Sequence, residues 1–490
     1  MKQIRQLAGQ TAIYGAGTIL PKFLNWIILT PFYTRIFVDQ ADYGSITELY
    51  AYVVILNVIV TFGMETGFFR FSQQNNSFRS VYTTAFLVVL VLATILVSGV
   101  NLFIKPLSEL IRYEENWQYL SWFSIIVAVD CLAAIPFAKL RREERAKRFT
   151  ILKLANISVN LLLIIFFLKL WPALYDSHPD AWFTKWYDPE LKVGYVFLAN
   201  LITSICVLVL ISGELRFLGG PLKKSILRDL LKYSAPLVIV GIAGAINEVA
   251  DKIFLKFLLP ESDSAMKEVG QYGASYRIAV IMTLFVQMFR YAFEPFLFAR
   301  KKKDGTEIYS QIMNLFVGMG LALFLFTVFY LDIFKVFLGP NYHEGLEVVP
   351  LILLANLFVG VFYNLSVWYK LSDLTRYGAV LAIGGSFVTI AANFILIPRI
   401  GYMGSAWATI LCYFSMMLGS YLWGRKVMPI PYKIWDFLMM LLVALVMFAV
   451  HKWIDPGTDL IKYSINTVML LSFLVLVNWR TGLMKIFFVR

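Results

Sequence analysis

The sequence predicts an all-α integral membrane protein with about fourteen transmembrane helices, arranged as two six-helix lobes in parallel repeat plus two C-terminal helices. Two observations predict the membrane class. The hydrophobic fraction is 59% and the mean hydropathy is +0.70, whereas soluble domains use about 45–50% apolar residues. The charged residues, 44 Lys and Arg against 31 Asp and Glu, gather in short connectors between long apolar runs. A bilayer can bury that apolar surplus, and a soluble fold of this length could not.

Each apolar run is long enough to cross a bilayer, because a helix rises about 1.5 Å per residue and the hydrocarbon core is about 30 Å thick. The first run contains Pro21 and Lys22 and lacks a small-residue cleavage site, so we expect a retained helix rather than a signal peptide. The connectors leave no room for a soluble catalytic domain. The predicted spans are 7–29, 44–66, 81–104, 117–138, 151–170, 193–212, 233–257, 271–298, 309–331, 347–368, 377–397, 402–424, 436–451 and 460–478.

Lys and Arg are concentrated in alternate connectors, for example in 139–150, 213–232 and 299–308. The positive-inside rule therefore predicts that both termini are cytoplasmic. The same basic clusters explain the net charge of +13 as topology anchors at anionic headgroups, so no nucleic-acid partner is expected.

A short internal repeat predicts how the spans are grouped. Tyr43 stands at the start of the second span and Tyr272 at the start of the eighth, and in both spans a glutamate follows at the same distance, Glu65 and Glu294. An offset of six helices keeps the two copies in the same orientation, as in a parallel repeat. The predicted organisation is an N-terminal lobe over 1–215, a C-terminal lobe over 216–426 and two extra helices over 427–490.

Ionisable side chains inside the spans concentrate on helices 1, 2, 7 and 8, which correspond to one another under the repeat. Such residues are costly in a bilayer and usually face a water-filled cavity or pair with each other. Both uses stay open for the Glu248–Lys252 and Arg290–Glu294 pairs, and the helix-end charges could instead reach the headgroups. The predicted substrate cavity comprises Lys22, Asn25, Glu65, Arg70, Glu248, Lys252, Arg277, Arg290 and Glu294.

Several kinds of chemistry are missing. The chain has no phosphate-binding loop of the G-x-x-x-x-G-K-[ST] type, no G-x-S-x-G and no H-E-x-x-H. Its three cysteines and three histidines lack the spacing of a zinc site. We therefore expect no catalytic residues, no enzyme activity, no bound metal centre and no organic cofactor.

Three segments resemble the polysaccharide-transport branch of the multidrug/oligosaccharidyl-lipid/polysaccharide exporter superfamily. They are the opening 10–17, the first loop 33–44 and the segment 393–408, Asn-Phe-Ile-Leu-Ile-Pro-Arg-Ile-Gly-Tyr-Met-Gly-Ser-Ala-Trp-Ala. The resemblance implies a flippase that moves undecaprenyl-diphosphate-linked oligosaccharides across the bacterial cytoplasmic membrane by alternating access. It implies membrane lipids, a glycan polymerase and chain-length machinery as partners. It also implies a coupling cation, Na⁺ or H⁺, at Asp251, Asn393 and Thr409.

Two other functions fit the same sequence. A cation-coupled multidrug or metabolite antiporter would have the same fold, because fold alone does not decide function. A membrane glycan polymerase or ligase would need a catalytic outward loop, and the connector 171–192 is short for that role. The glycan itself cannot be deduced from the residues.

Overall fold

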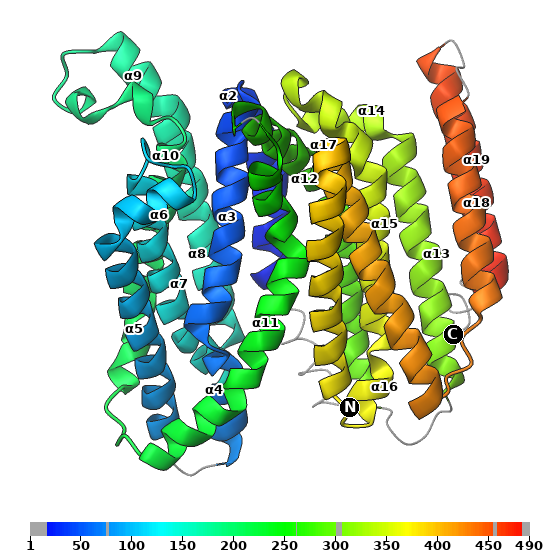
Figure 1. The fold of residues 1–490 in the computed structure, drawn as a ribbon, viewed down its shortest axis with the longest axis horizontal. Helices are drawn as coiled ribbons and strands as arrows, with labels where there is room; N and C mark the ends of the chain where they lie inside the picture. The colour runs from blue at the N-terminus through cyan, green and yellow to red at the C-terminus, as the bar shows by residue number, and fades with distance from the viewer. Residues whose placement is uncertain (1–16, 75–77, 261, 300–305, 454–457, 483–490) are drawn as a thin grey trace. The chain divides into compact units, whose positions relative to one another are not determined.

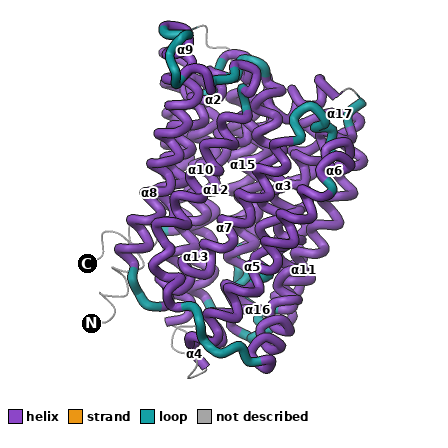
Figure 2. Tube along the Cα trace, turned by 90° about the vertical axis from the view of Figure 1, so that its left-hand side faces the viewer, coloured by secondary structure: helices purple, strands orange, loops and turns teal. Residues whose placement is uncertain are grey.

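The computed structural model describes residues 17–74, 78–260, 262–299, 306–453 and 458–482. Within these ranges the chain forms helices joined by short loops and contains no strand (Figure 1, Figure 2). Eleven helices in the described ranges are long and apolar enough to cross a membrane. The prediction of an all-α integral membrane protein is confirmed.

The predicted spans fall on these helices, with two differences in how they are divided. Helix α17 (Arg376–Val427) holds two predicted spans, because its backbone angles are non-helical at Ile400 and Gly401. The seventh span lies on α11 (Lys224–Leu258), which carries polar residues and is not among the eleven. The first span begins before residue 17 and lies partly outside the described residues.

The chain divides into two compact units. Among the described residues, unit 1 comprises those up to Leu29 together with Ser45–Val249. Unit 2 comprises Thr30–Gly44 and the residues from Ala250 onward. The predicted lobe boundaries after residues 215 and 426 concern the sequence repeat and stay a prediction.

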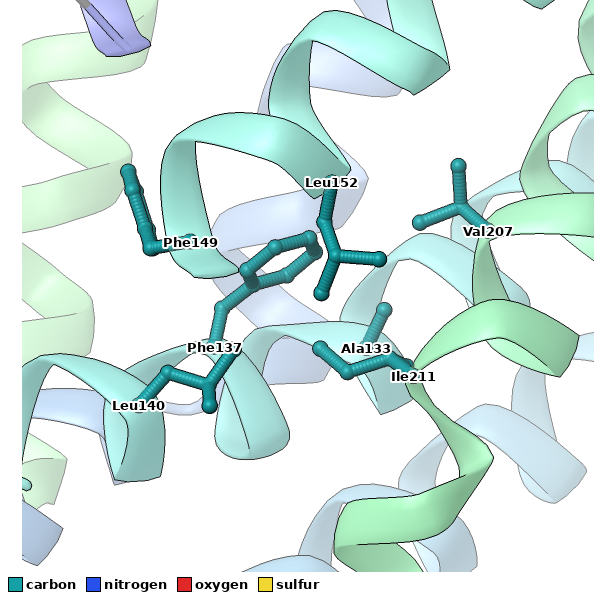
Figure 3. Close-up of a cluster of buried hydrophobic side chains, with 7 residues drawn as sticks. All are labelled: Ala133, Phe137, Leu140, Phe149, Leu152, Val207 and Ile211. Atoms are coloured by element: carbon teal, nitrogen blue, oxygen red, sulfur yellow. The ribbon is translucent and has the colours of Figure 1, made fainter. Parts of the chain in front are cut away.

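Unit 1 is built on three closely packed helices, α7, α8 and α10. Figure 3 shows the apolar cluster that joins them, formed by Ala133, Phe137, Leu140, Phe149, Leu152, Val207 and Ile211. The elements that begin in this unit are a helix over 17–24, η1 (Asn25–Leu29), α4 (Met64–Gln74), α5 (Phe78–Leu102), α6 (Ile104–Leu110), α7 (Gln118–Arg142), α8 (Ala146–Ile165), η2 (Phe166–Leu170), α9 (Trp171–Ser177), η3 (Thr184–Trp186), η4 (Pro189–Leu191), α10 (Gly194–Ile211), η5 (Ser212–Phe217) and α11.

Unit 2 packs α12, α13, α15 and α17 together, and its last two helices, α18 and α19, pack on α13 (Figure 1). Those two helices are the least buried of the eleven, at 11% and 17%, as expected of helices that face lipid. The elements that begin in this unit are α2 (Thr30–Ile36), α3 (Gln40–Thr61), α12 (Ser262–Ala299), α13 (Glu307–Phe329), α14 (Leu331–Phe334), η6 (Lys335–Phe337), η7 (Pro340–Val348), α15 (Val349–Leu365), α16 (Val367–Leu371), α17, α18 (Ile434–Trp453) and α19 (Asp459–Thr481).

The break in α17 has a clear cause in the segment 393–408. Gly401 has φ +56° and ψ −139°, a conformation that residues with a Cβ atom avoid. Gly404 packs so closely that an added Cβ atom would lie 2.6 Å from the carbonyl carbon of Leu396. The two glycines therefore allow one span to end and the next to begin without a loop.

Candidate substrate and ion sites

A buried carboxylate organises a polar cluster inside unit 2. Asp251 on α11 is 4% exposed, and its Oδ2 accepts a hydrogen bond of 2.6 Å from the Tyr272 hydroxyl on α12. Its Oδ1 accepts from the backbone N–H of Lys252 at 2.9 Å and from the Lys252 ammonium at 3.0 Å. The same ammonium lies 4.3 Å from the centre of the Tyr276 ring. We call these four residues the Asp251 cluster.

Helix α17 adds a chain of hydroxyl and amide groups to this cluster. The Thr409 hydroxyl lies near the Tyr272 hydroxyl. Thr409 Oγ1 donates to the backbone carbonyl of Ser405 at 2.9 Å, and Ser405 Oγ donates to Asn393 Oδ1 at 3.2 Å. Asn393 is fully buried and donates to the carbonyl of Thr389 at 2.7 Å. Of the three residues predicted for the cation site, Asn393 and Thr409 are thus linked by hydrogen bonds through Ser405, and Asp251 belongs to the Asp251 cluster.

The donor set fits a proton better than a metal cation. The Lys252 ammonium already lies at ion-pair distance from Asp251, and a second positive charge beside it would be repelled strongly in a medium of low dielectric. A proton needs only one oxygen atom. The short bond between the Tyr272 phenol and Asp251 supplies a partner for either protonation state of the carboxyl group. We therefore assign no metal ion to this cluster.

The predicted cavity residues of unit 1 lie on its first helix, α4 and α11. Lys22 is exposed, and Asn25 begins the π-helical turn η1. Glu65 forms an ion pair with Arg141 of α7. The Arg70 guanidinium lies 4.4 Å from the centre of the Tyr233 ring.

The remaining predicted cavity residues, apart from Arg290, lie on α11 and α12. Glu248 is exposed near the end of the α11 portion that belongs to unit 1. In unit 2, Arg277 is exposed on α12, and Lys252 belongs to the Asp251 cluster. The side chain of Glu294 lies outside the described residues.

Arg290 of α12 lines a small and mostly apolar cavity in unit 2. Its guanidinium is 5.0 Å from the centre of the Tyr363 ring. The cavity has a volume of about 10 Å³ and is also lined by Lys370, Asn364 and Ser366. That volume holds about one water molecule. Arg290 and Lys370 thus both line this cavity at the predicted cytoplasmic end of α12 and α15, and guanidinium and ammonium groups are donors suited to phosphate oxygens.

A larger apolar cavity lies between α13, α15, α17 and α18, also in unit 2. Its volume is about 230 Å³, and its lining includes Met313, Phe414, Leu418, Phe437 and Leu438. Lys433 lies at its edge, at the start of α18. Such a lining accommodates a hydrocarbon chain and exposes almost no polar surface to the cavity.

Sequence reasoning missed several residues that the structure places at these sites. Tyr272 served only as a marker of the repeat, Lys370 only as a topology anchor, and Lys256 was not considered. Lys256 is 1% exposed and lies one helical turn after Lys252 on α11. The spacing of four residues between the two lysines was the available signal.

The described residues contain no group of three or more His, Cys, Asp or Glu side chains that could hold a metal ion. Each of the three cysteines is a free thiol. These sites can therefore bind and move charged groups through ammonium, guanidinium, carboxyl and hydroxyl groups.

Comparison with known proteins identifies the family of this chain and proteins that share its fold. A family model described as polysaccharide biosynthesis protein matches residues 8–299, which is more than half of the chain. A search of curated proteins finds no match. The structure is similar to the lipid II flippase MurJ in an inward closed conformation, with a TM-score of 0.67 and 16% identity over 98% of this chain and 100% of that chain.

The structure is also similar to a multidrug resistance MATE family transporter of the MOP superfamily. Its inward-facing conformation gives a TM-score of 0.64 at 13% identity, covering 82% of this chain and 94% of that chain. Its outward-facing conformation gives 0.58 at 13% identity, covering 85% and 93%. Likenesses at such low identity establish the fold that these proteins share.

Proposed function

The chain belongs to the polysaccharide biosynthesis protein family, and we propose that it moves a polyprenyl-diphosphate-linked oligosaccharide across the bacterial cytoplasmic membrane. Movement occurs by alternating access, with both termini in the cytoplasm, and supplies the synthesis of a surface polysaccharide. The fold that it shares with a lipid II flippase supports a lipid-linked substrate. A glycan polymerase and chain-length machinery would use the product on the outer face.

The observation that carries this proposal is that Arg290 and Lys370 both line one cavity at the predicted cytoplasmic end of α12 and α15. A diphosphate carries about two negative charges, which cannot enter hydrocarbon without replacement of their hydration. Guanidinium and ammonium groups supply charge-assisted hydrogen bonds to phosphate oxygens. Lys22, Asn25, Glu65, Arg70, Glu248, Arg277 and Glu294 are proposed to line the path of the headgroup.

The polyprenyl tail needs no polar path. We assign the apolar cavity beside α18 to a hydrocarbon chain, because its lining offers van der Waals contact and almost no hydrogen-bonding group. This gives the two C-terminal helices a role in holding lipid at the side of unit 2.

The Asp251 cluster is proposed to bind a proton during the return step. With Asp251 ionised, the cluster is neutral, because the charge of Lys252 balances it. Protonation of Asp251 would leave the charge of Lys252 unbalanced, so the cluster would carry one positive charge. Asn393 and Thr409, which hydrogen bonds link through Ser405 on α17, are proposed to take part in this step.

The test is genetic and chemical. The gene is deleted from its source bacterium and restored as the unsubstituted form, Arg290→Ala, Lys22→Ala or Arg376→Ala. Arg376 is the matched control, because its guanidinium also lies over a tyrosine ring, at 5.5 Å from the centre of Tyr377. Surface polysaccharide and the pool of polyprenyl-diphosphate oligosaccharide on each leaflet are then measured.

Deletion should abolish the polysaccharide and accumulate the lipid-linked precursor on the inner leaflet. Arg290→Ala and Lys22→Ala should each lower export about tenfold or more, because a hydrogen bond to a charged group contributes about 1.5–3 kcal/mol. Arg376→Ala should export normally. Intact polysaccharide with raised drug sensitivity on deletion would identify an antiporter instead, and precursor accumulating on the outer leaflet would identify a polymerase or ligase.

A further inference from the structure

The corner between α7 and α8 in unit 1 gathers three cations around one buried carboxylate. Glu214 of η5 is 3% exposed. Its Oε2 lies 2.6 Å from the ammonium of Lys139 on α7. Its Oε1 lies 3.0 Å from Nη1 of Arg145 and 2.9 Å from Nη1 of Arg148. We call these four residues the Glu214 cluster.

The turn between α7 and α8 fixes the backbone that carries these cations. The chain passes from one helix to the other in the three residues 143–145. The backbone N–H of Arg145 donates to the carbonyl oxygen of Leu140 at 2.9 Å. Leu140 and Phe149 belong to the apolar cluster of Figure 3, which packs α7 against α8 beside this turn. The two arginines are therefore held by a packed corner rather than by a long loop.

The charges of this corner do not cancel. Lys139 also pairs with Glu143 at 2.8 Å, and Nη1 of Arg145 lies 3.5 Å from the other oxygen of that carboxylate. Three cations thus share two carboxylates, which leaves a net charge of +1. The whole connector 139–150 holds six Lys and Arg against two Glu. At a partly buried site, where the dielectric is lower than in water, this surplus attracts an anion more strongly than at an open surface.

The two arginines keep most of their hydrogen-bond donors available. A guanidinium group carries five N–H donors, and Arg145 and Arg148 contact carboxylates through Nη1 alone. Within the described part of the chain, their Nε and Nη2 atoms make no hydrogen bond. Their side chains are 40% and 39% exposed, against 6% for Lys139. Lys139 therefore neutralises the carboxylates inside the corner, and the arginines can bind a further anion outside it.

The corner lies at the level of a membrane surface. The predicted span on α7 ends at residue 138 and the predicted span on α8 begins at residue 151, so the three cations fall in the connector between them, on the predicted cytoplasmic side. Basic pockets between transmembrane helices on that side bind anionic lipid headgroups. The planar fork of a guanidinium group matches the geometry of phosphate oxygens.

We propose that Arg145 and Arg148 form a binding site for the phosphate group of an anionic phospholipid in the inner leaflet. Glu214 positions both guanidinium groups through their Nη1 atoms, and the remaining donors bind the phosphate oxygens. The surplus positive charge favours an anionic headgroup, such as that of phosphatidylglycerol, over the zwitterionic headgroup of phosphatidylcholine. The transported molecule plays no part in this site, so the inference does not depend on the function proposed above.

The test measures lipid binding to the purified full-length protein. Native mass spectrometry follows the protein as phosphatidylglycerol, phosphatidylcholine or inorganic phosphate is titrated into the detergent solution. The variants are Arg145→Ala, Arg148→Ala and the combination of both. Arg216→Ala is the matched control, because Arg216 is an exposed cation of η5 and makes no ion pair within the described residues.

The unsubstituted protein should bind phosphatidylglycerol about tenfold or more tightly than phosphatidylcholine. Each alanine variant of the site should lower the affinity for phosphatidylglycerol about tenfold or more, because it removes charge-assisted hydrogen bonds. Arg216→Ala should bind as the unsubstituted protein does. Equal affinity for the two lipids, or unchanged binding of phosphatidylglycerol by the double variant, would overturn the proposal. Inorganic phosphate that binds as tightly as phosphatidylglycerol would also overturn it, since the ligand would then be a soluble anion.

Two further variants decide if the alanine variants do not fold. Arg145→Lys and Arg148→Lys keep the positive charge and replace the planar fork by a point charge. Each should still weaken the binding of phosphatidylglycerol several-fold, and unchanged binding in both would overturn the proposal.

Discussion

Replacing Gly270 of α12 by alanine should destabilise unit 2, because the backbone of α3 crosses it at contact distance. A Cβ atom added at Gly270 would overlap the carbonyl oxygen of Gln40 and lie 2.8 Å from its carbonyl carbon. The favourable separation of two carbon atoms is about 3.5–4.0 Å. These are backbone atoms, which cannot rotate away as a side chain can, so α3 and α12 would have to move apart.

The size of the effect follows from two opposing contributions. Forcing extra volume into a packed site costs about 1–3 kcal/mol, and alanine is favoured over glycine in a helix by about 1 kcal/mol. The matched control is Gly384→Ala in α17, where an added Cβ atom would meet nothing within 4 Å. Both substitutions gain the helix preference of alanine over glycine, but only Gly270→Ala creates the overlap. The free energies of unfolding of the two variants should therefore differ by about 1–3 kcal/mol.

The assay is thermal unfolding of the purified protein, followed by tryptophan fluorescence. At ~2 °C per kcal/mol for a unit of this size, Gly384→Ala should melt about 2–6 °C above Gly270→Ala. Gly44→Ala approaches the same crossing from α3, with an added Cβ atom 3.1 Å from the carbonyl carbon of Met266. Combining it with Gly270→Ala should cost less than the sum of both, because the two changes force apart the same helices. Equal melting of Gly270→Ala and Gly384→Ala would refute the reasoning.

Three further variants have measurable outcomes. Tyr272→Phe should lower the free energy of unfolding by about 1.5–3 kcal/mol, because a buried hydrogen bond to a charged carboxylate is lost, and an unchanged melting temperature would contradict this. Asp332, outside the spans, has its pKa lowered from 3.8 to about 2 by hydrogen bonds from Lys335 and Lys462. Its stabilisation is therefore present above about pH 4 and is lost as pH falls toward 2. Near neutral pH, Asp332→Asn should have a free energy of unfolding lower than that of the unsubstituted protein by less than ~1 kcal/mol. The melting temperatures of the two proteins should become equal in acid. Gly401→Ala should cost about 1–3 kcal/mol, since φ is positive there, and normal expression and melting would argue against a strained break.

Properties that depend on short stretches of sequence could be predicted. The spans could be predicted from the length of the apolar runs. The helix break in the segment 393–408 could also be predicted, because it depends on the backbone conformation and close packing of Gly401 and Gly404 within that segment. The close approach of Gly44 and Gly270 within unit 2 could not be predicted, because it depends on how helices far apart in sequence pack.

Contacts between distant residues could not be predicted from spacing. Arg141 was read as a topology anchor, and the structure pairs it with Glu65, which the sequence had placed in the substrate cavity. The sequence left open whether Lys252 pairs with Glu248 one turn away, and it gave no sign of the bond that Lys252 makes to the adjacent Asp251. Helical periodicity shows which side chains share a face, and the partner on the next helix is set by tertiary packing.

The Asp251 cluster, which we propose as a proton site, combines a carboxylate with the ammonium of Lys252. The pair is neutral when the carboxyl group is ionised and would carry one positive charge on protonation. Moving one charge through the whole membrane field is worth about 2.3 kcal/mol per 100 mV. An inside-negative potential therefore favours outward movement of the anionic diphosphate headgroup. It also favours an inward return of a site that has bound a proton. Because Lys252 stays charged when Asp251 is protonated, the site would carry a net positive charge, and the membrane field would act on that charge during the proposed return step.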